Sequence, residues 1–255
     1  LLFRGYEVIA LVTDPSQAPA AWGRDVELVI GQITDPAAVD TALSGAEAVL
    51  NTWDPRLRPR SRRLDLAEGT AQIVAGMHRH GIRRYIGHGT PVVSLCPKEK
   101  PTTHVKVHRF LARHLHAHAY RQMTGMLQVV AGSGLDWTIV RFMHATGGSA
   151  RGLKYVGFFG PGAAGSSATA TDIARFTATQ ILETAYIRDA IVADVPGVTR
   201  DRLYGTVTFE RWQATVVPVA AAALQMFLMT AASGMGPTCD LRGERMPHHT
   251  PLIST

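Results

Sequence analysis

The stretch that decides the fold is Gly134-Leu135-Asp136-Trp137-Thr138-Ile139-Val140-Arg141. Gly134 stands where the preceding helical pattern stops, and residues 137–140 have the pattern of a short buried strand. Because this strand is apolar without alternation, it suits a parallel sheet that is covered on both faces. The stretch therefore indicates an α/β protein.

Similar short apolar segments alternate with helical patterns along the first 190 residues. Further strands are expected at 6–12, 27–31, 46–51 and 84–88, and helices at 36–43, 64–80, 105–130 and 172–186. Gly125 is a candidate break within the third helix. Strands that alternate with helices predict right-handed crossovers and a parallel sheet.

Composition limits the class of protein. The chain has 255 residues, of which 46% are hydrophobic and 18% charged, with a formal net charge of +6. These values suit one globular α/β domain with an appendage, and an anionic small ligand rather than nucleic acid, for which no motif is present. Cys96 and Cys239 form neither a disulfide framework nor a metal-ligand pattern, which fits a reducing compartment such as the cytoplasm.

The C-terminal part has a different character. The strand–helix pattern ends near residue 195, so we expect a domain over 1–195 and an extension over 196–255. Residues 214–234 carry no charge, which predicts an apolar helix that packs in a core or on a partner. Their length, roughly 20 residues, would also permit a membrane span, but the many alanines make membrane contact the less favoured interpretation. Residues 236–255 are expected to be a disordered tail.

Five short motifs follow one another along the chain: GYEVIALVxDP from Gly5, GxITDP from Gly31, GAEAVL from Gly45, GIRRYIG from Gly81 and GLDWTIVR from Gly134. In this order they resemble the atypical short-chain dehydrogenase/reductases, in particular the NAD(P)H-binding group that includes NmrA-like regulators and biliverdin-reductase-like enzymes. The resemblance covers about residues 1–190. It implies a Rossmann-like doubly wound parallel sheet that binds NAD or NADP together with a small-molecule substrate.

The resemblance also implies a missing part. The family begins with a strand and a GxxGxxG turn that opens a helix, where backbone N–H groups hold the pyrophosphate. This sequence starts at Leu1 without them, and the later glycine-rich run at 157–162 follows the wrong strand. We therefore expect an N-terminally truncated chain, preceded by roughly 15–25 residues, whose sheet lacks its central strand.

The resemblance assigns cofactor contacts to residues where strands end. They are Thr13, Gln32, Ile33, Asn51, Thr52, Trp53, Gly87 and Phe142. Thr13 stands where many NADP-preferring relatives have arginine, so the choice between NAD and NADP stays open, while Gln32 and Ile33 match the pair beside adenine. The alternative is that these residues only form strand-end turns, but ligands of open α/β sheets bind at this edge.

Catalytic residues are expected after the fourth of these strands. The larger family uses a YxxxK motif, whereas here Tyr120 is followed four residues later by Thr124, so Tyr120 is expected to be a packing or surface residue. Thr90 and His88 occupy the region of the family's catalytic hydroxyl, where Thr90 could orient a carbonyl and His88 could transfer a proton. Alternatively, both residues only complete the loop before Pro91.

These assignments leave two functions. The first is an NAD(P)-binding oxidoreductase that transfers hydride to or from a small carbonyl-like substrate. The alternative is a non-catalytic dinucleotide-sensing regulator of the NmrA-like kind, which the absence of YxxxK favours.

Two clusters outside the strand ends carry charge. His104 with His108, and His114 with His118, are spaced i, i+4, but without a nearby cysteine or carboxylate they predict a solvated basic helix rather than a metal site. The arginines of residues 56–63 could meet a cofactor phosphate or a substrate carboxylate, or form a solvated loop.

Overall fold

The computed structural model describes residues 1–52, 65–93, 102–143, 145–153, 155–157, 168–194 and 224–230. The strands are β1 (Glu7–Val12), β2 (Val26–Ile30), β3 (Ala48–Asn51), β4 (Arg84–Gly89), β5 (Asp136–Arg141), β6 (Ala145–Thr146), β7 (Tyr155–Gly157), β8 (Ala168–Thr169), β9 (Asp189–Asp194) and β10 (Leu224–Thr230). The α-helices are α1 (Pro36–Leu43), α2 (Leu66–Arg79), α3 (Thr103–Leu115), α4 (Ala117–Gly132) and α5 (Ala170–Thr179).

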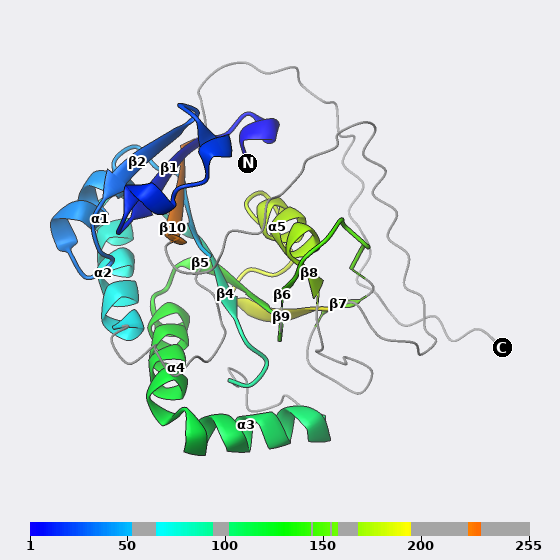
Figure 1. The fold of residues 1–255 in the computed structure, drawn as a ribbon. Coiled ribbons are helices and arrows are strands. Elements are labelled where there is room, and N and C mark those ends of the chain that lie inside the picture. The colour runs from blue at the N-terminus through cyan, green and yellow to red at the C-terminus, as the bar shows by residue number, and fades with distance from the viewer. Residues whose placement is uncertain are drawn as a thin grey trace.

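Eight strands form one sheet in the order β2-β1-β10-β3-β4-β5-β9-β7 (Figure 1). The pairs β1–β2, β3–β4, β4–β5 and β5–β9 are parallel, whereas β10 and β7 run antiparallel to their neighbours. A mainly parallel sheet reached through helical connections is the Rossmann-like arrangement that the sequence predicted, and this prediction is confirmed.

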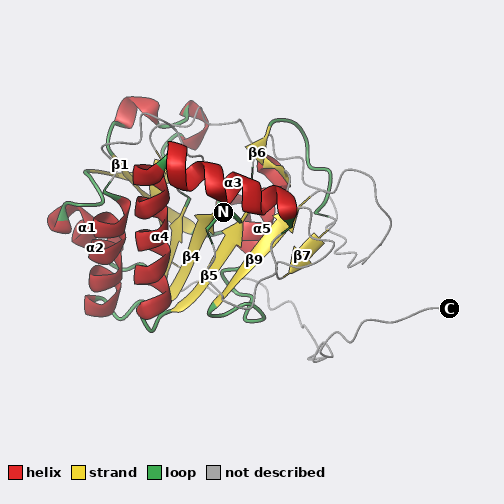
Figure 2. Ribbon diagram, turned by 90° about the horizontal axis from the view of Figure 1, so that it is seen from below, coloured by secondary structure: helices red, strands yellow, loops and turns green. Residues whose placement is uncertain are grey.

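Helices cover both faces of the sheet. On one face α1, α2 and α4 pack through a large core that includes Val39, Ile73 and Leu127 (Figure 2). On the other face α5 packs through Ile173 against Ile86 and neighbouring strand residues. Strands that are buried on both faces need no polar alternation, which explains the continuous apolar run at 137–140.

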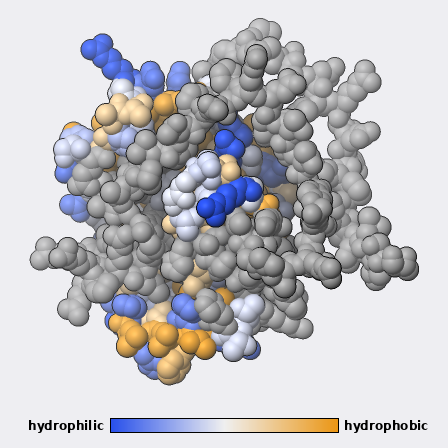
Figure 3. All heavy atoms as spheres, turned by 45° about the vertical axis from the view of Figure 1, so that its right-hand side comes forward, coloured by the Kyte–Doolittle hydropathy of each residue, from blue (hydrophilic) through white to orange (hydrophobic). Residues whose placement is uncertain are grey.

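The helix that was expected over 105–130 is two helices. The chain leaves the helical conformation at His116, with φ −128° and ψ 40°, and not at Gly125. Gly125 instead lies inside α4, where an added Cβ would stand 2.8 Å from the Cβ of Ala67 on α2. The glycine therefore permits close helix packing, and α3 turns away across the end of the molecule, where it exposes apolar side chains (Figure 3).

The C-terminal extension departs most from expectation. Residues 224–230 form β10 rather than part of a helix, and β10 pairs antiparallel with both β1 and β3. It thus occupies the position where the sequence predicted a gap. An uncharged apolar run suits a buried strand as well as a buried helix, and the unpaired backbone groups of β1 and β3 favour the strand. The remainder of 214–234 and the tail at 236–255 lie outside the described residues.

Two smaller differences concern the last part of the domain. The helix expected over 172–186 is the shorter α5, and β9 follows it as a further parallel strand that the sequence analysis missed. Among the described residues, no helix combines the length and the apolar character needed to cross a membrane.

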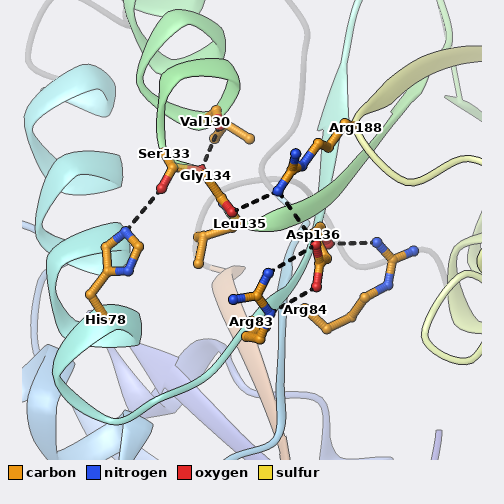
Figure 4. A network of polar contacts seen from close by, with 9 residues as sticks. All are labelled: His78, Arg83, Arg84, Val130, Ser133, Gly134, Leu135, Asp136 and Arg188. Atoms are coloured by element: carbon orange, nitrogen blue, oxygen red, sulfur yellow. Dashed lines mark hydrogen bonds and ion pairs between the residues drawn. The ribbon is translucent and has the colours of Figure 1, made fainter.

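A polar network surrounds the start of the stretch 134–141 at the amino-terminal edge of the sheet (Figure 4). The Asp136 carboxylate accepts a hydrogen bond of 3.1 Å from Nε of Arg83, and its backbone carbonyl accepts one of 2.7 Å from Arg84. Arg188 donates to the carbonyl of Gly134 at 3.2 Å. These contacts tie the starts of β4 and β5 together, so they support the fold at the edge opposite to the candidate site.

Candidate functional site

The sequence-predicted cofactor residues gather at the carboxyl edge of the parallel strands. Thr13 follows β1, Gln32 and Ile33 follow β2, Asn51 ends β3, and Phe142 follows β5. Thr52 directly follows Asn51, and Gly87 lies within β4. Trp53 and the arginine-rich run at 56–63 lie outside the described residues. Because parallel strands end at one edge, residues far apart in sequence line the same border, where open α/β sheets bind ligands.

The corner between β2 and α1 is closely packed. An added Cβ on Gly31 would lie 2.3 Å from the Cβ of Ala38, so only glycine lets the chain turn here against α1. Ile33 is buried, and its side chain lies where a Cβ on Gly69 of α2 would stand. Ile33 therefore packs into the core, and of the pair expected beside adenine Gln32 is the exposed member.

The end of β3 combines a satisfied and an unsatisfied polar side chain. Asn51 is buried and donates from Nδ2 to the Tyr85 hydroxyl oxygen at 3.0 Å. Burial raises the pKa of Tyr85 well above its usual value, so this hydroxyl stays protonated. The neighbouring Thr52 Oγ1 is buried and has no hydrogen-bond partner among the described residues. A buried hydroxyl without a partner at a ligand-binding edge is a candidate contact for a polar ligand.

The end of β4 lacks bulky side chains on the face of α2 and α4. A Cβ on Gly87 would lie 2.8 Å from Cδ1 of Ile139 and 2.9 Å from Cε1 of Tyr85. Gly87 is thus required by the packing of its own neighbours within the sheet, whether or not a ligand approaches it.

His88 faces α5. Its Nε2 lies 3.0 Å from Oγ1 of Thr177, and its ring stands edge-on to Phe142 with centroids 5.1 Å apart. Three elements, β4, the end of β5 and α5, therefore meet at one half-buried imidazole. Sequence reasoning missed Thr177, whose only signal was its place one turn after Ile173 on the inward face of α5.

The Thr90 hydroxyl is engaged by its own turn and by Met143. Its hydroxyl accepts a hydrogen bond from the backbone N–H of Val92 at 3.4 Å and lies 3.9 Å from the sulfur of Met143, to which it donates. Thr90 and His88 therefore both contact the segment that follows β5, through Met143 and Phe142, but only His88 also reaches α5. Tyr120 packs against two of the apolar clusters, in agreement with the role expected from the absence of lysine.

Comparison with known proteins identifies the family. A model of the NAD(P)H-binding family matches residues 1–184, and the chain belongs to this family. The match confirms the predicted resemblance and the predicted cofactor, NAD or NADP.

Solved structures share the fold. A wide-type short-chain dehydrogenase/reductase from Veillonella parvula in complex with NADP has 19% identity and a TM-score of 0.52, covering 72% of this chain and 80% of its own. The oxidoreductase ylbE from Lactococcus lactis has 18% identity and a TM-score of 0.56, covering 72% and 78%. ChuY, an anaerobillin reductase from Escherichia coli O157:H7, has 15% identity and a TM-score of 0.57, covering 76% and 86%.

The carboxyl edge carries polar groups in two places. Exposed Thr13 and Gln32 follow β1 and β2, and the buried Thr52 hydroxyl, which has no hydrogen-bond partner among the described residues, follows β3. In this fold the pyrophosphate is held by a helix N-terminus that follows the central strand. Here the central position belongs to β10, which runs in the opposite direction, so within the described residues no strand-to-helix turn follows it at this edge.

Proposed function

We propose that this protein is an NAD(P)H-dependent oxidoreductase that reduces a small carbonyl-like substrate. The observation that carries the proposal is the meeting of His88, Thr177 and Phe142 at the carboxyl edge of a sheet of the NAD(P)H-binding family. When bound, NAD(P)H supplies the hydride, and the protein has to orient the substrate and provide a proton.

In this proposal His88 holds the proton. Histidine is the side chain that exchanges protons near neutral pH, and the Thr177 hydroxyl at Nε2 fixes the orientation of the ring. Thr90 orients the substrate carbonyl. Its hydroxyl proton points to a thioether sulfur, which is a weak acceptor, so a carbonyl oxygen can compete for it.

The cofactor assignments of the remaining edge residues belong to the same proposal. Thr13 lies near the adenosine ribose and Gln32 beside adenine, while Asn51, Thr52, Gly87 and Phe142 border the rest of the dinucleotide. Because Thr13 supplies no cation for a 2′-phosphate, the protein uses NAD(H) at least as well as NADP(H).

A dinucleotide-sensing regulator is the second candidate. The observation in its favour is that Tyr120, which no lysine follows at the YxxxK spacing, packs against the core, and that Thr90 is engaged within its own turn. Such a protein would bind the dinucleotide without turning over a substrate.

Steady-state kinetics separate the two candidates. NADH and NADPH are first titrated by nicotinamide fluorescence, and oxidation is then followed with a panel of small aldehydes, ketones and imines. For the enzyme we expect His88→Gln and Thr90→Val to lower turnover about 10²–10⁴-fold with little change in cofactor affinity. Tyr120→Phe is the matched control and should keep wild-type turnover.

Dinucleotide binding without substrate-dependent oxidation would support the regulator. Wild-type turnover in the His88 and Thr90 variants, together with a collapse in Tyr120→Phe, would refute the residue assignment. Because His88→Gln keeps a side-chain amide that can hydrogen-bond Thr177, a lost hydrogen bond to Thr177 would not explain a loss of activity in this variant.

A further inference from the structure

The outer face of α3 is unusually apolar for an exposed helix. Val107, Phe110, Leu111 and Leu115 are 51%, 62%, 43% and 70% exposed. Figure 3 shows apolar side chains gathered with strongly polar ones at the lower end of the molecule, where Figure 1 places α3. Several large exposed apolar side chains on one short helix mark an interaction surface rather than ordinary solvent exposure.

The spacing of these residues makes α3 amphipathic with its apolar side outward. Val105 and Ala112, seven residues apart, are buried against the body of the protein. Val107, Leu111 and Leu115 follow one another at i, i+4 along the exposed surface of the helix. The helix therefore already has a packed inner face, and the outer face is a second, unpartnered apolar stripe.

Basic side chains flank this stripe. Lys106, Arg109 and Arg113, together with Phe110 and His114, line a shallow hollow of about 450 Å³. Arg109 donates from Nε to the carbonyl of Val92 at 2.8 Å, while its Nη2 is buried without a hydrogen-bond partner among the described residues. The hollow thus presents three cations, which suits a phosphate group.

The charge of the surrounding sequence has a single sign. Between Glu99 and Asp136 there is no acidic residue, whereas Lys100, Arg121 and the three cations of the hollow lie in this interval. An apolar stripe beside an uncompensated basic flank is the pattern of a helix that lies in the interface of an anionic bilayer.

We propose that the outer face of α3 docks on a membrane surface that contains anionic phospholipid. Val107, Phe110, Leu111 and Leu115 enter the boundary between headgroups and acyl chains, and the basic flank binds lipid phosphates. A second copy of the chain fits this face less well, because a two-fold contact would bring the basic flanks of both copies, each with Lys106 and Arg113, into one interface of like charge.

The docking surface is connected to the candidate site. Ala112, on the inner face of α3, forms a small apolar cluster with Val92 and Met143, and Met143 contacts the Thr90 hydroxyl. When α3 is docked, this helix alone would therefore separate the turn that contains Thr90 from the lipid headgroups.

Vesicle sedimentation with the full chain tests the proposal. The probes are vesicles of phosphatidylcholine alone and of phosphatidylcholine mixed with phosphatidylglycerol. We expect binding to the mixed vesicles only, weakened by added salt. Leu115→Ala should lower the affinity about tenfold and Arg113→Gln about fivefold, because each removes a side chain that contacts lipid.

Matched controls lie elsewhere on the surface. Leu182 is 77% exposed and Arg175 is exposed on α5, so Leu182→Ala and Arg175→Gln make the same chemical changes away from α3 and should bind like the wild type. Equal binding to both kinds of vesicle, or no binding to either, would overturn the proposal. So would a dimer in analytical ultracentrifugation that Leu115→Ala dissociates, because the stripe would then be a contact between copies.

Discussion

At the scale of single residues, glycines determine how closely α1 and α2 approach the sheet and each other, because they have no side chain. Gly31 is the clearest case, because its added Cβ would overlap the Cβ of Ala38 at 2.3 Å. Both atoms belong to backbone-fixed positions, so neither can rotate away. We expect Gly31→Ala to lower the free energy of unfolding by about 1–3 kcal/mol, the usual cost of overpacking.

Gly132→Ala is the matched control for urea denaturation. Gly132 ends α4, and an added Cβ would meet nothing within 4 Å. Alanine should therefore leave stability unchanged or raise it by about 0.4–1 kcal/mol, since it restricts the unfolded chain. If both substitutions had the same effect, the close approach of α1 at Gly31 would not be the reason for glycine there.

At the scale of elements, α5 begins with a side-chain cap, in which Thr169 is the N-cap residue. Thr169 Oγ1 accepts from the backbone N–H of Asp172 at 3.0 Å and donates to its carboxylate at 2.6 Å. The same buried carboxylate accepts backbone hydrogen bonds from Arg151 at 2.9 Å and Gly152 at 3.1 Å. Asp172 therefore joins the helix start to the loop that precedes β7.

Asp172→Asn should loosen this junction. The amide keeps one acceptor oxygen but replaces the other with a donor, so at least one of these donors loses its partner, at a cost of about 1–3 kcal/mol. Asp35→Asn is the control, because Asp35 is exposed, caps α1 through one bond to the Ala37 N–H, and asparagine caps as well as aspartate. Equal losses of thermal stability in the two variants would contradict this account.

Local signals explain which elements the sequence could predict. The start of α1 was predictable because Asp35 is a standard N-cap residue and Pro36 suits the first helical position. Three chain reversals were predictable as well, because Gly45, Gly81 and Gly134 adopt the positive φ that such turns require. The break at His116 was not, because no turn residue marks it and only the different packing of α3 and α4 decides it. The same limit applies to β10, whose apolar run has no periodicity that separates strand from helix.

The candidate site was likewise predictable in part. Its position at the carboxyl edge followed from the order of strands and helices. The contacts of its side chains did not, because Thr177 lies 89 residues from His88 and reaches it only through the packing of α5. Nor could the sequence show that Ile33 packs into the core while Gln32 stays exposed.

At the scale of the whole molecule, β10 joins two parts of one sheet. On one side lie β1, β2 and α1, and on the other lie β3, β4, β5, β9 and β7. Without β10 the two parts would be connected mainly through α1 and α2, where Leu43 packs over Gly76. A strand in a central position satisfies backbone groups of both neighbours, so β10 should couple the unfolding of the two parts.

Phe227→Pro tests this coupling. Phe227 pairs with Ala10 of β1 and with Leu50 of β3, and proline there removes a ladder N–H from a central strand. We expect a loss of about 1–3 kcal/mol in urea denaturation. We also expect weaker hydrogen-exchange protection in both β1 and β3, with residues of β1, β2 and α1 opening before the rest. Leu224→Pro, at the first residue of β10 where the register with β1 shifts, should cost much less. Unchanged protection at Ala10 and Leu50 in Phe227→Pro would mean that β10 does not hold the sheet together, and that β1 and β3 find their hydrogen-bond partners in another way.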